Sequence, residues 1–491
     1  MSYLYLKAPI FSIVTKKGLV LATACGGSSK TGIPNLLVAF RCDKTLPAVL
    51  DQVKTSSLDD TDDVSDDCSS VLIKDLSLET GHDIEHLKLA ISQNGRLVAA
   101  LCGNSSCRLY SWNERSILLS SDDIGMNLAK SNTCKSTSTQ SLDILFTFMS
   151  TSSKDIEASS VAIYSDNIIA IGDITGKIYI WRLIYNKSTK SDGNDTIEVK
   201  KMASLVGHKG KVTSLYFDNK GETLVSASDD DTLRVWEVNF LINSSKSDII
   251  SSIVLCHVIH GRGNIDLGNR FVQRGRKGSS LRWKFRGVSM LPDGCSLFAL
   301  ETSDIGGAVL VKWRTTSIKD KAILKNDVTT IAPIEYVSLD GKISTTIEND
   351  TRNKLEPTRR WIFSIWTVAS STPASALASN STFDRLVVGS NDGSVRLFDS
   401  NVLGSPLWVR KDVHQMSVTC VAFVENGDKK VDDIYIVTGS ADAQLVLLPI
   451  TAPPQTLNPR LVAFLLLLLT LTFALTSFYK HVDKNDIETE L

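Results

Sequence analysis

The chain has 491 residues, 43% of them hydrophobic, with a formal net charge of −1 and a pI near 6.7. That length predicts either several domains or one large repeat architecture, and the absence of a basic excess means that no nucleic-acid partner is expected. The cysteines are odd in number, nine, and none lies in a Cys-x-x-Cys pair. This argues against a disulfide framework and a zinc site, and it fits a reducing compartment.

The first feature along the chain is a long glycine-containing loop at 23–35, which reads TACGGSSKTGIPN. It connects two strand-like runs at 18–22 and 36–41, whereas tight hairpins use about two to five residues. Loops of this length inside a compact domain are usually functional or disordered. The loop is not a phosphate-binding motif, because Ala24 and Ser29 occupy the two positions where that motif requires glycine.

Several stretches are rich in Ser, Asp and other polar residues. Such composition cannot bury a core, so we predict solvated, disordered inserts. They cover about 51–82, 120–143, 186–198 and 317–356.

Repeats form the body of the chain. Apolar residues alternate with period 2 and are separated by regular Asp or Gly turns, which predicts antiparallel strands, four to a blade. The repeats are the N-terminal unit with the long loop, followed by segments at 91–112, 160–183, 205–238, 285–313, 365–399 and 413–448. We therefore predict an all-β fold, a seven-bladed WD-repeat β-propeller spanning residues 1–450.

The repeat at 205–238 is nearly complete, with a Gly-His start, a turn of three aspartates and a closing tryptophan. His208, Ser228, Asp230 and Trp236 are predicted to form the hydrogen-bond network that holds strands within such a blade. Their role is structural. No triad or metal cluster can be assembled from the residue spacing, so we expect no enzyme with covalent chemistry.

One basic stretch, 262–286, interrupts the repeats. It is either a charged surface loop or a contact with anionic lipid headgroups, where each basic residue near the surface contributes about 1 kcal/mol. Both interpretations stay open.

The C-terminus predicts a membrane anchor. No charged residue occurs from Leu461 to Tyr479, and a helix of that length is about 28 Å long, close to the thickness of the hydrocarbon core. We predict a Pro-rich linker at 451–460, one transmembrane helix at 461–479 and a short lumenal tail at 480–491. The N-terminus lacks the apolar region of a signal peptide, so the propeller is expected in the cytosol.

The loop pattern GG-x4-GIPN-x-L resembles one family, the Sec-twelve exchange factors of the endoplasmic reticulum, whose animal members are called prolactin regulatory element-binding protein. The segment at 418–423 and the order of propeller, linker and single span are similar to that family as well. In the family the loop binds a potassium ion and reaches the switch region of the small GTPase Sar, which starts COPII coat assembly. The family usually has four glycines where this chain reads Ala-Cys-Gly-Gly.

The resemblance implies a guanine nucleotide exchange factor for a Sar-type GTPase at the endoplasmic reticulum membrane, acting in ER-to-Golgi transport. Exchange of this kind is differential binding, which accelerates GDP release without covalent chemistry. Asn35 corresponds to the asparagine that the family uses against the GTPase, with Ile33 and Pro34 as apolar contacts. A structural potassium ion would bind backbone carbonyls of four consecutive residues: Ala24, Cys25, Gly26 and Gly27. The protein is expected to be a monomer.

Two other functions are considered. The chain could be a non-catalytic, membrane-anchored WD-repeat scaffold for partners of the secretory pathway. The family's animal name also suggests transcriptional regulation, but a membrane anchor and the lack of positive charge disfavour direct DNA binding.

Overall fold

The computed structural model divides the chain into two compact units, Met1–Ile450 and Thr451–Leu491. The residues that it describes are 2–6, 8–16, 18–26, 33, 35–42, 72–79, 86–103, 105–111, 143–149, 151, 156–186, 196–241, 249–260, 283–291, 293–303, 306–317, 336–337, 343–344, 359–380, 384–425, 434–451, 470 and 472. The predicted linker, transmembrane helix and lumenal tail lie outside these residues, apart from Thr451, Thr470 and Thr472. Within the described set, no helix has the length and apolarity needed to cross a membrane.

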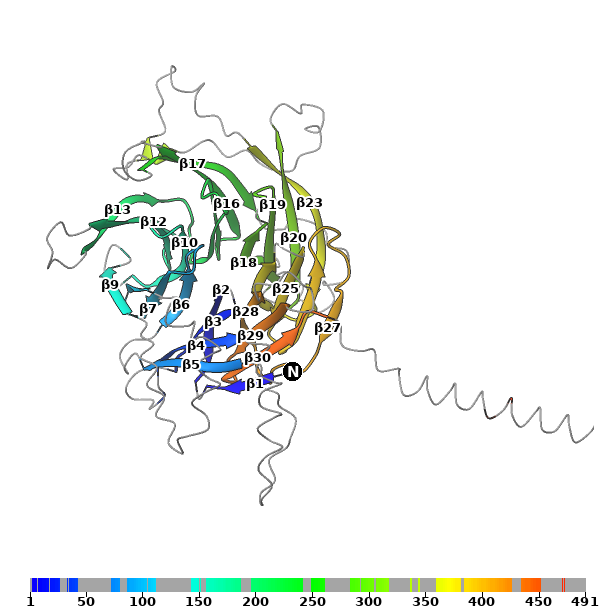
Figure 1. The fold of residues 1–491 in the computed structure, drawn as a ribbon. Helices are drawn as coiled ribbons and strands as arrows, with labels where there is room; N and C mark the ends of the chain where they lie inside the picture. Colours follow the sequence, from blue (N-terminus) through cyan, green and yellow to red (C-terminus); the bar gives the residue numbers. More distant parts are fainter. Residues whose placement is uncertain are drawn as a thin grey trace, which may run out of the picture. The chain divides into compact units, whose positions relative to one another are not determined.

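The first unit consists of seven antiparallel sheets, six with four strands and one with six (Figure 1). The first three sheets contain β2 (Ile10–Lys16), β3 (Leu19–Ala24), β4 (Leu36–Cys42) and β5 (Leu72–Glu79); β6 (His86–Ile91), β7 (Leu97–Cys102), β8 (Ser106–Ser111) and β9 (Asp143–Met149); and β10 (Ala158–Tyr164), β11 (Ile168–Asp173), β12 (Ile178–Asn186) and β13 (Thr196–Leu205). The fourth and fifth contain β14 (Val212–Phe217), β15 (Thr223–Ser228), β16 (Thr232–Leu241), β17 (Ile249–His260), β21 (Tyr336–Val337) and β22 (Ile343–Ser344); and β18 (Trp283–Met290), β19 (Ser296–Ser303), β20 (Ala308–Ser317) and β23 (Arg359–Ser370). The last two contain β24 (Ala374–Asn380), β25 (Arg385–Ser390), β26 (Val395–Asp399) and β27 (Trp408–Arg410); and β28 (Val418–Glu425), β29 (Ile434–Ser440), β30 (Gln444–Pro449) and β1 (Ser2–Tyr5).

These sheets form a closed ring. The first strand of each sheet packs against the first strand of the next, and β28 of the seventh sheet packs against β2 of the first. The extreme N-terminus closes the ring, because β1 pairs with β30 from Ser2 opposite Leu447 to Tyr5 opposite Gln444 (Figure 1). The prediction of a seven-bladed all-β propeller is confirmed, and we call each sheet a blade, numbered from β2–β5 onward.

Apolar packing lies between the blades rather than in one central core. Seven clusters of buried side chains each join two adjacent blades. The second strand of a blade is therefore covered on both faces, and β3, β7, β11, β15 and β19 are buried along their whole length. Strands covered on both faces carry continuous apolar runs instead of an alternating pattern.

The innermost strands share one irregularity. Each first strand has a register shift of one residue near its start, at an equivalent place in all seven blades. A bulge of this kind bends the strand and redirects a side chain. The extra residues are Phe11, Leu87, Ser159, Thr213, Arg286, Ser375 and Thr419.

Hydroxyl groups at these bulges link neighbouring blades. Ser159 Oγ donates to Val212 O at 2.7 Å, and Thr213 Oγ1 donates to Phe285 O at 2.8 Å. The same contact runs from Ser375 Oγ to Val418 O at 2.7 Å and from Thr419 Oγ1 to Ile10 O. In blade 5 the extra residue is Arg286, and Thr302 of the next strand supplies the hydroxyl instead, to Ala374 O at 2.6 Å. The inner strands are thus tied by a repeated contact as well as by apolar packing.

All four intervals that were predicted as disordered inserts overlap strands. The interval from about 51 to 82 includes β5, which completes blade 1, and 317–356 includes β21 and β22 at the edge of blade 4. At their ends, 120–143 overlaps β9 at Asp143, and 186–198 overlaps β12 at Asn186 and β13 from Thr196. A propeller blade needs a fourth strand, and the acidic composition around β5 concealed it. The basic stretch 262–286 overlaps β18 from Trp283, and its other residues lie outside the described ones.

Candidate functional site

The loop between β3 and β4 of blade 1 is fixed at its base. The backbone N–H of Gly26 donates to Asn35 Oδ1 at 3.3 Å, and the N–H of Cys25 donates to Pro9 O at 2.9 Å. Asn35 is only 2% exposed and Cys25 only 1%. Both arms of the loop are therefore held to blade 1 where they leave the sheet.

Gly26 and Ile33 are in direct contact across the two arms. A Cβ atom on Gly26 would lie 1.9 Å from Ile33 Cγ2, so this position accepts no side chain without a shift of its neighbour. Ile33 itself packs against the apolar cluster between blades 1 and 7. The glycine and the isoleucine of the sequence motif therefore form one packed base.

The predicted potassium ligands are only partly described. Ala24 ends β3 and Cys25 and Gly26 follow it, while Gly27 and Pro34, which is predicted to contact the GTPase, lie outside the described residues. Oxygen atoms are the ligands that hard cations take, and backbone carbonyls supply them without any particular side chain. No charged side chain occurs at 24–26 and Gly26 carries no side chain, which is compatible with a site built from backbone carbonyls. Side-chain metal clusters of three or more His, Cys, Asp or Glu do not occur among the described residues.

The strand order shows at which end of the ring this loop lies. In every blade the connection between the second and third strands lies at the end where the innermost strand begins, since successive strands are antiparallel. The loop after β3 therefore shares its end of the ring with the turn between β15 and β16, whose N–H at Asp229 donates to Lys211 O just before β14.

That turn belongs to the predicted network in blade 4. His208 Nδ1 lies 3.2 Å from Asp230 Oδ2 and 2.9 Å from Thr232 Oγ1. His208 Nε2 lies 2.8 Å from Ser226 Oγ, which also accepts the indole N–H of Trp236 at 2.9 Å. The imidazole thus connects the turn to the third strand of the blade through one hydroxyl.

Ser228, which was predicted as part of this network, occupies a different place in it. Its Oγ donates to Gly210 O at 3.0 Å and accepts the N–H of Asp230 at 3.2 Å, so it holds the turn and not the indole. Ser226 supplies the hydroxyl between His208 and Trp236, and sequence reasoning missed it. Residues two apart on a strand share a face, so the sequence alone does not say which serine meets the ring.

Blade 7 repeats the arrangement without the tryptophan. His414 Nδ1 lies 3.2 Å from Asp442 Oδ2, and His414 Nε2 lies 2.8 Å from Thr438 Oγ1. Each histidine also abuts a glycine of the preceding blade: a Cβ on Gly176 would lie 2.4 Å from His208 O, and one on Gly393 would lie 2.0 Å from His414 O. These networks therefore join neighbouring blades at the end of the ring that carries the loop.

Burial determines the charge state of both histidines. It lowers the pKa of His208 and of His414 below the ordinary value, and the aspartates beside them offset this only in part. For Asp230, burial raises the pKa, but hydrogen bonds from His208 and Thr232 outweigh it and hold the pKa below its usual range. A neutral imidazole beside a carboxylate fits a structural role.

We expect the propeller to lose stability as the pH falls below about 6.5, the pKa of an unperturbed histidine. Because the folded pKa of each histidine is depressed, the unfolded chain binds more protons in that window, so unfolding becomes easier as the pH falls. Thermal melting at pH 7.5 and 5.5 measures the effect. The double variant His208→Gln, His414→Gln should show a smaller loss between these pH values, and an unchanged loss would contradict the assignment.

Comparison with known proteins indicates the class of protein. The family WD domain, G-beta repeat matches residues 199–237 and 363–399. Each match begins in the outer strand of one blade, β13 or β23, and ends in the third strand of the next, β16 or β26. The sequence repeat is therefore offset from the blade, which links consecutive blades through the chain. Together with the seven blades, these matches fit a WD-repeat protein, a class compatible with a scaffold or interaction role. Among curated proteins, no sequence matches this chain.

Proposed function

We propose that the protein is a guanine nucleotide exchange factor for a Sar-type small GTPase, anchored in the endoplasmic reticulum membrane by residues 461–479 with its propeller in the cytosol. In this role it starts COPII coat assembly and ER-to-Golgi transport. The observation that carries the proposal is the packed base of the loop, where Gly26, Ile33 and Asn35 of the motif meet. Because these base residues are already fixed, they lose little conformational entropy when the loop docks.

Asn35, Ile33 and Pro34 are the residues proposed to act on the GTPase. In the free chain Asn35 is buried and its Oδ1 accepts the N–H of Gly26. Direct contact between Asn35 and the GTPase therefore requires this buried side chain to become accessible on docking. Until then its hydrogen bond with Gly26 fixes the base of the loop.

Potassium, bound by carbonyls of Ala24, Cys25, Gly26 and Gly27, would stiffen the loop further. The ion supplies no chemistry to the exchange reaction. It would preorganise the backbone, and a faster exchange rate in potassium than in sodium is the expected consequence.

The proposal predicts a preference among nucleotide states. An exchange factor accelerates release only if it binds the nucleotide-free GTPase more tightly than the GDP-loaded form. We expect the full-length chain in detergent to bind nucleotide-free Sar-type GTPase at least about tenfold more tightly, a difference of about 1.4 kcal/mol. Equal affinity for the two forms would favour the scaffold.

The scaffold remains the second candidate because two apolar side chains are exposed in one connection of blade 6. Val402 is 73% exposed and Leu407 49%, and both lie between β26 and β27. Exposed apolar groups in one segment can mark a surface that binds another protein. Under this alternative the protein gathers partners at the membrane as a monomer and leaves nucleotide release unchanged.

A further inference from the structure

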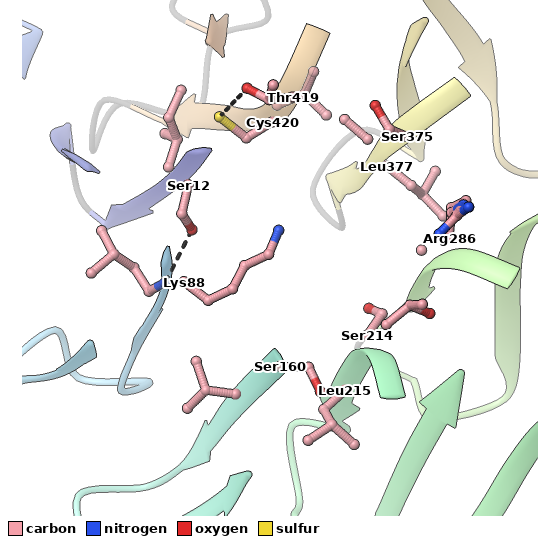
Figure 2. A pocket seen from close by; sticks show the side chains of 17 residues that line it. Ser12, Lys88, Ser160, Ser214, Leu215, Arg286, Ser375, Leu377, Thr419 and Cys420 are labelled. Atoms are coloured by element: carbon pink, nitrogen blue, oxygen red, sulfur yellow. Dashed lines mark hydrogen bonds between the residues drawn. The ribbon is translucent and has the colours of Figure 1, made fainter. Parts of the chain in front are cut away.

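The central channel of the propeller is lined by the innermost strands of all seven blades. It encloses a space of ≈ 160 Å³ whose lining includes, in chain order, the residue that directly follows each bulge (Figure 2). Six of these seven residues are small. They are Ser12, Ser160, Ser214, Gly287, Ala376 and Cys420, and the seventh is Lys88 of blade 2.

The lysine extends into the space that the small residues leave. Figure 2 shows the Lys88 side chain reaching from β6 toward the middle of the opening. Its ammonium group forms no hydrogen bond and no ion pair with the residues that the structure describes. No aspartate or glutamate is among the lining residues.

Neighbouring charges do not neutralise the lysine. Arg286, the other cation of the lining, pairs with Asp229 through an Nη1–Oδ1 distance of 3.0 Å. Burial raises the pKa of the Cys420 thiol to about 11, so this group stays neutral near pH 7. Burial lowers the pKa of Lys88 and the nearby Lys211 lowers it further, while Cys420 opposes this only in its thiolate form. No carboxylate of the lining pairs with Lys88, so an anion bound beside it would stabilise its charged form.

A second polar group in the same lining also lacks a partner. Ser160 is only 3% exposed, and its Oγ is buried without a hydrogen bond among the described residues. A buried hydroxyl without a partner calls for an explanation, and a bound water, ion or ligand is one. Of the other lining hydroxyls, three already donate to carbonyls of the adjacent blade, namely Thr213, Ser375 and Thr419. Ser12 and Ser214 accept the backbone N–H groups of Leu89 and Val288.

We propose that the channel binds a small oxyanion of the phosphate class, with Lys88 Nζ as the charged donor and Ser160 Oγ as a hydroxyl donor once its side chain rotates from its place over Gly172 toward the opening. Lysine binds phosphate as a point charge, and the hydroxyl supplies a directed hydrogen bond. A space of ≈ 160 Å³ holds several water molecules, which suits a single phosphate group and not a drug-sized ligand. This site is independent of the proposed exchange activity.

The first test is calorimetric titration of the full-length chain in detergent with inorganic phosphate at constant ionic strength. We expect saturable binding of one anion per chain. Lys88→Met keeps most of the side-chain length and removes the charge, so it should weaken binding by at least about tenfold, the lower range for a hydrogen bond to a charged group. Lys88→Arg should retain most of the affinity.

The matched control is Lys220→Met. Lys220 is exposed and lies in the turn after β14, the first strand of blade 4. This substitution should leave phosphate affinity unchanged. Ser160→Ala is the second variant, chosen because it keeps the charge and changes little volume, and it should weaken binding by about threefold, as expected for loss of one neutral hydrogen bond. Circular dichroism and melting of each variant without phosphate show that it is folded.

Glycerol phosphate, titrated in parallel, distinguishes free phosphate from a phosphate group that belongs to a larger molecule. Tighter binding of the ester would assign the phosphate to a larger molecule that reaches the channel from its mouth, and tighter binding of phosphate would assign it to the free ion. Either result supports the site. Absence of saturable binding to both anions, or equal affinity in the folded Lys88→Met variant, would overturn the proposal.

Discussion

Replacing Asn35 by alanine is expected to slow GDP release from a Sar-type GTPase by about tenfold or more, a barrier change of at least about 1.4 kcal/mol. The substitution removes the acceptor for the Gly26 N–H at the base of the loop and the amide proposed to meet the GTPase. The measurement is the rate of GDP release with each variant at equal concentration. Melting temperature and membrane association should be preserved.

Two further variants sharpen this prediction. Asn35→Asp keeps an oxygen acceptor for Gly26 but loses the amide donor, so it separates bracing of the loop from contact with the GTPase. Asn401→Ala is the matched control, since Asn401 is an exposed asparagine in blade 6, far along the chain from the loop. Unchanged release by Asn35→Ala would remove the loop from the mechanism.

Trp236→Ala is expected to cause the largest loss of stability, about 3–5 kcal/mol, as for other fully buried tryptophans cut to alanine. Trp236 is 1% exposed, packs in the cluster between blades 3 and 4, and donates its indole N–H to Ser226. Its removal leaves a cavity and leaves the hydroxyl with one partner fewer. Thermal melting of the full-length chain measures the change.

Trp236→Phe separates the two contributions to this loss of stability, packing and the hydrogen bond to Ser226. The phenyl ring retains most of the packing and loses the hydrogen bond, so its cost should be nearer to the roughly 1 kcal/mol of one such bond plus a small packing term. A loss below about 1 kcal/mol for Trp236→Ala would show that this blade relaxes around the cavity, contrary to the dense packing expected of a core.

Much of the propeller was predictable because its repeats carry local signals. Gly-His at 207–208 and the aspartate turn before Trp236 identify blade 4 by themselves, and weaker copies place the other blades. The closing strand was not predictable. Its four residues, Ser2–Tyr5, are too short to carry a repeat pattern, and they pair with β30 from the other end of the unit.

The two candidate sites, the loop of blade 1 and the channel at Lys88, also differ in how much of each the sequence predicts. The loop motif was visible as consecutive residues, yet the burial of Asn35 depends on how the chain returns past Gly26 and could not be read from the sequence. Lys88 lies in HLKLAI, which reads as an ordinary alternating strand. Only closure of the ring shows that this face of β6 borders a channel whose other six equivalent positions are small.

GDP release from a Sar-type GTPase, followed with and without the full-length chain in potassium and in sodium buffer, tests the central claim most directly. The proposal predicts release at least about tenfold faster with the protein than without it, which corresponds to about 1.4 kcal/mol of barrier, and a smaller acceleration in sodium. Equal acceleration in both buffers would keep the exchange function and remove the potassium site. Release at the intrinsic rate, with folded protein present, would contradict the exchange function and leave the WD-repeat scaffold as the account of this molecule.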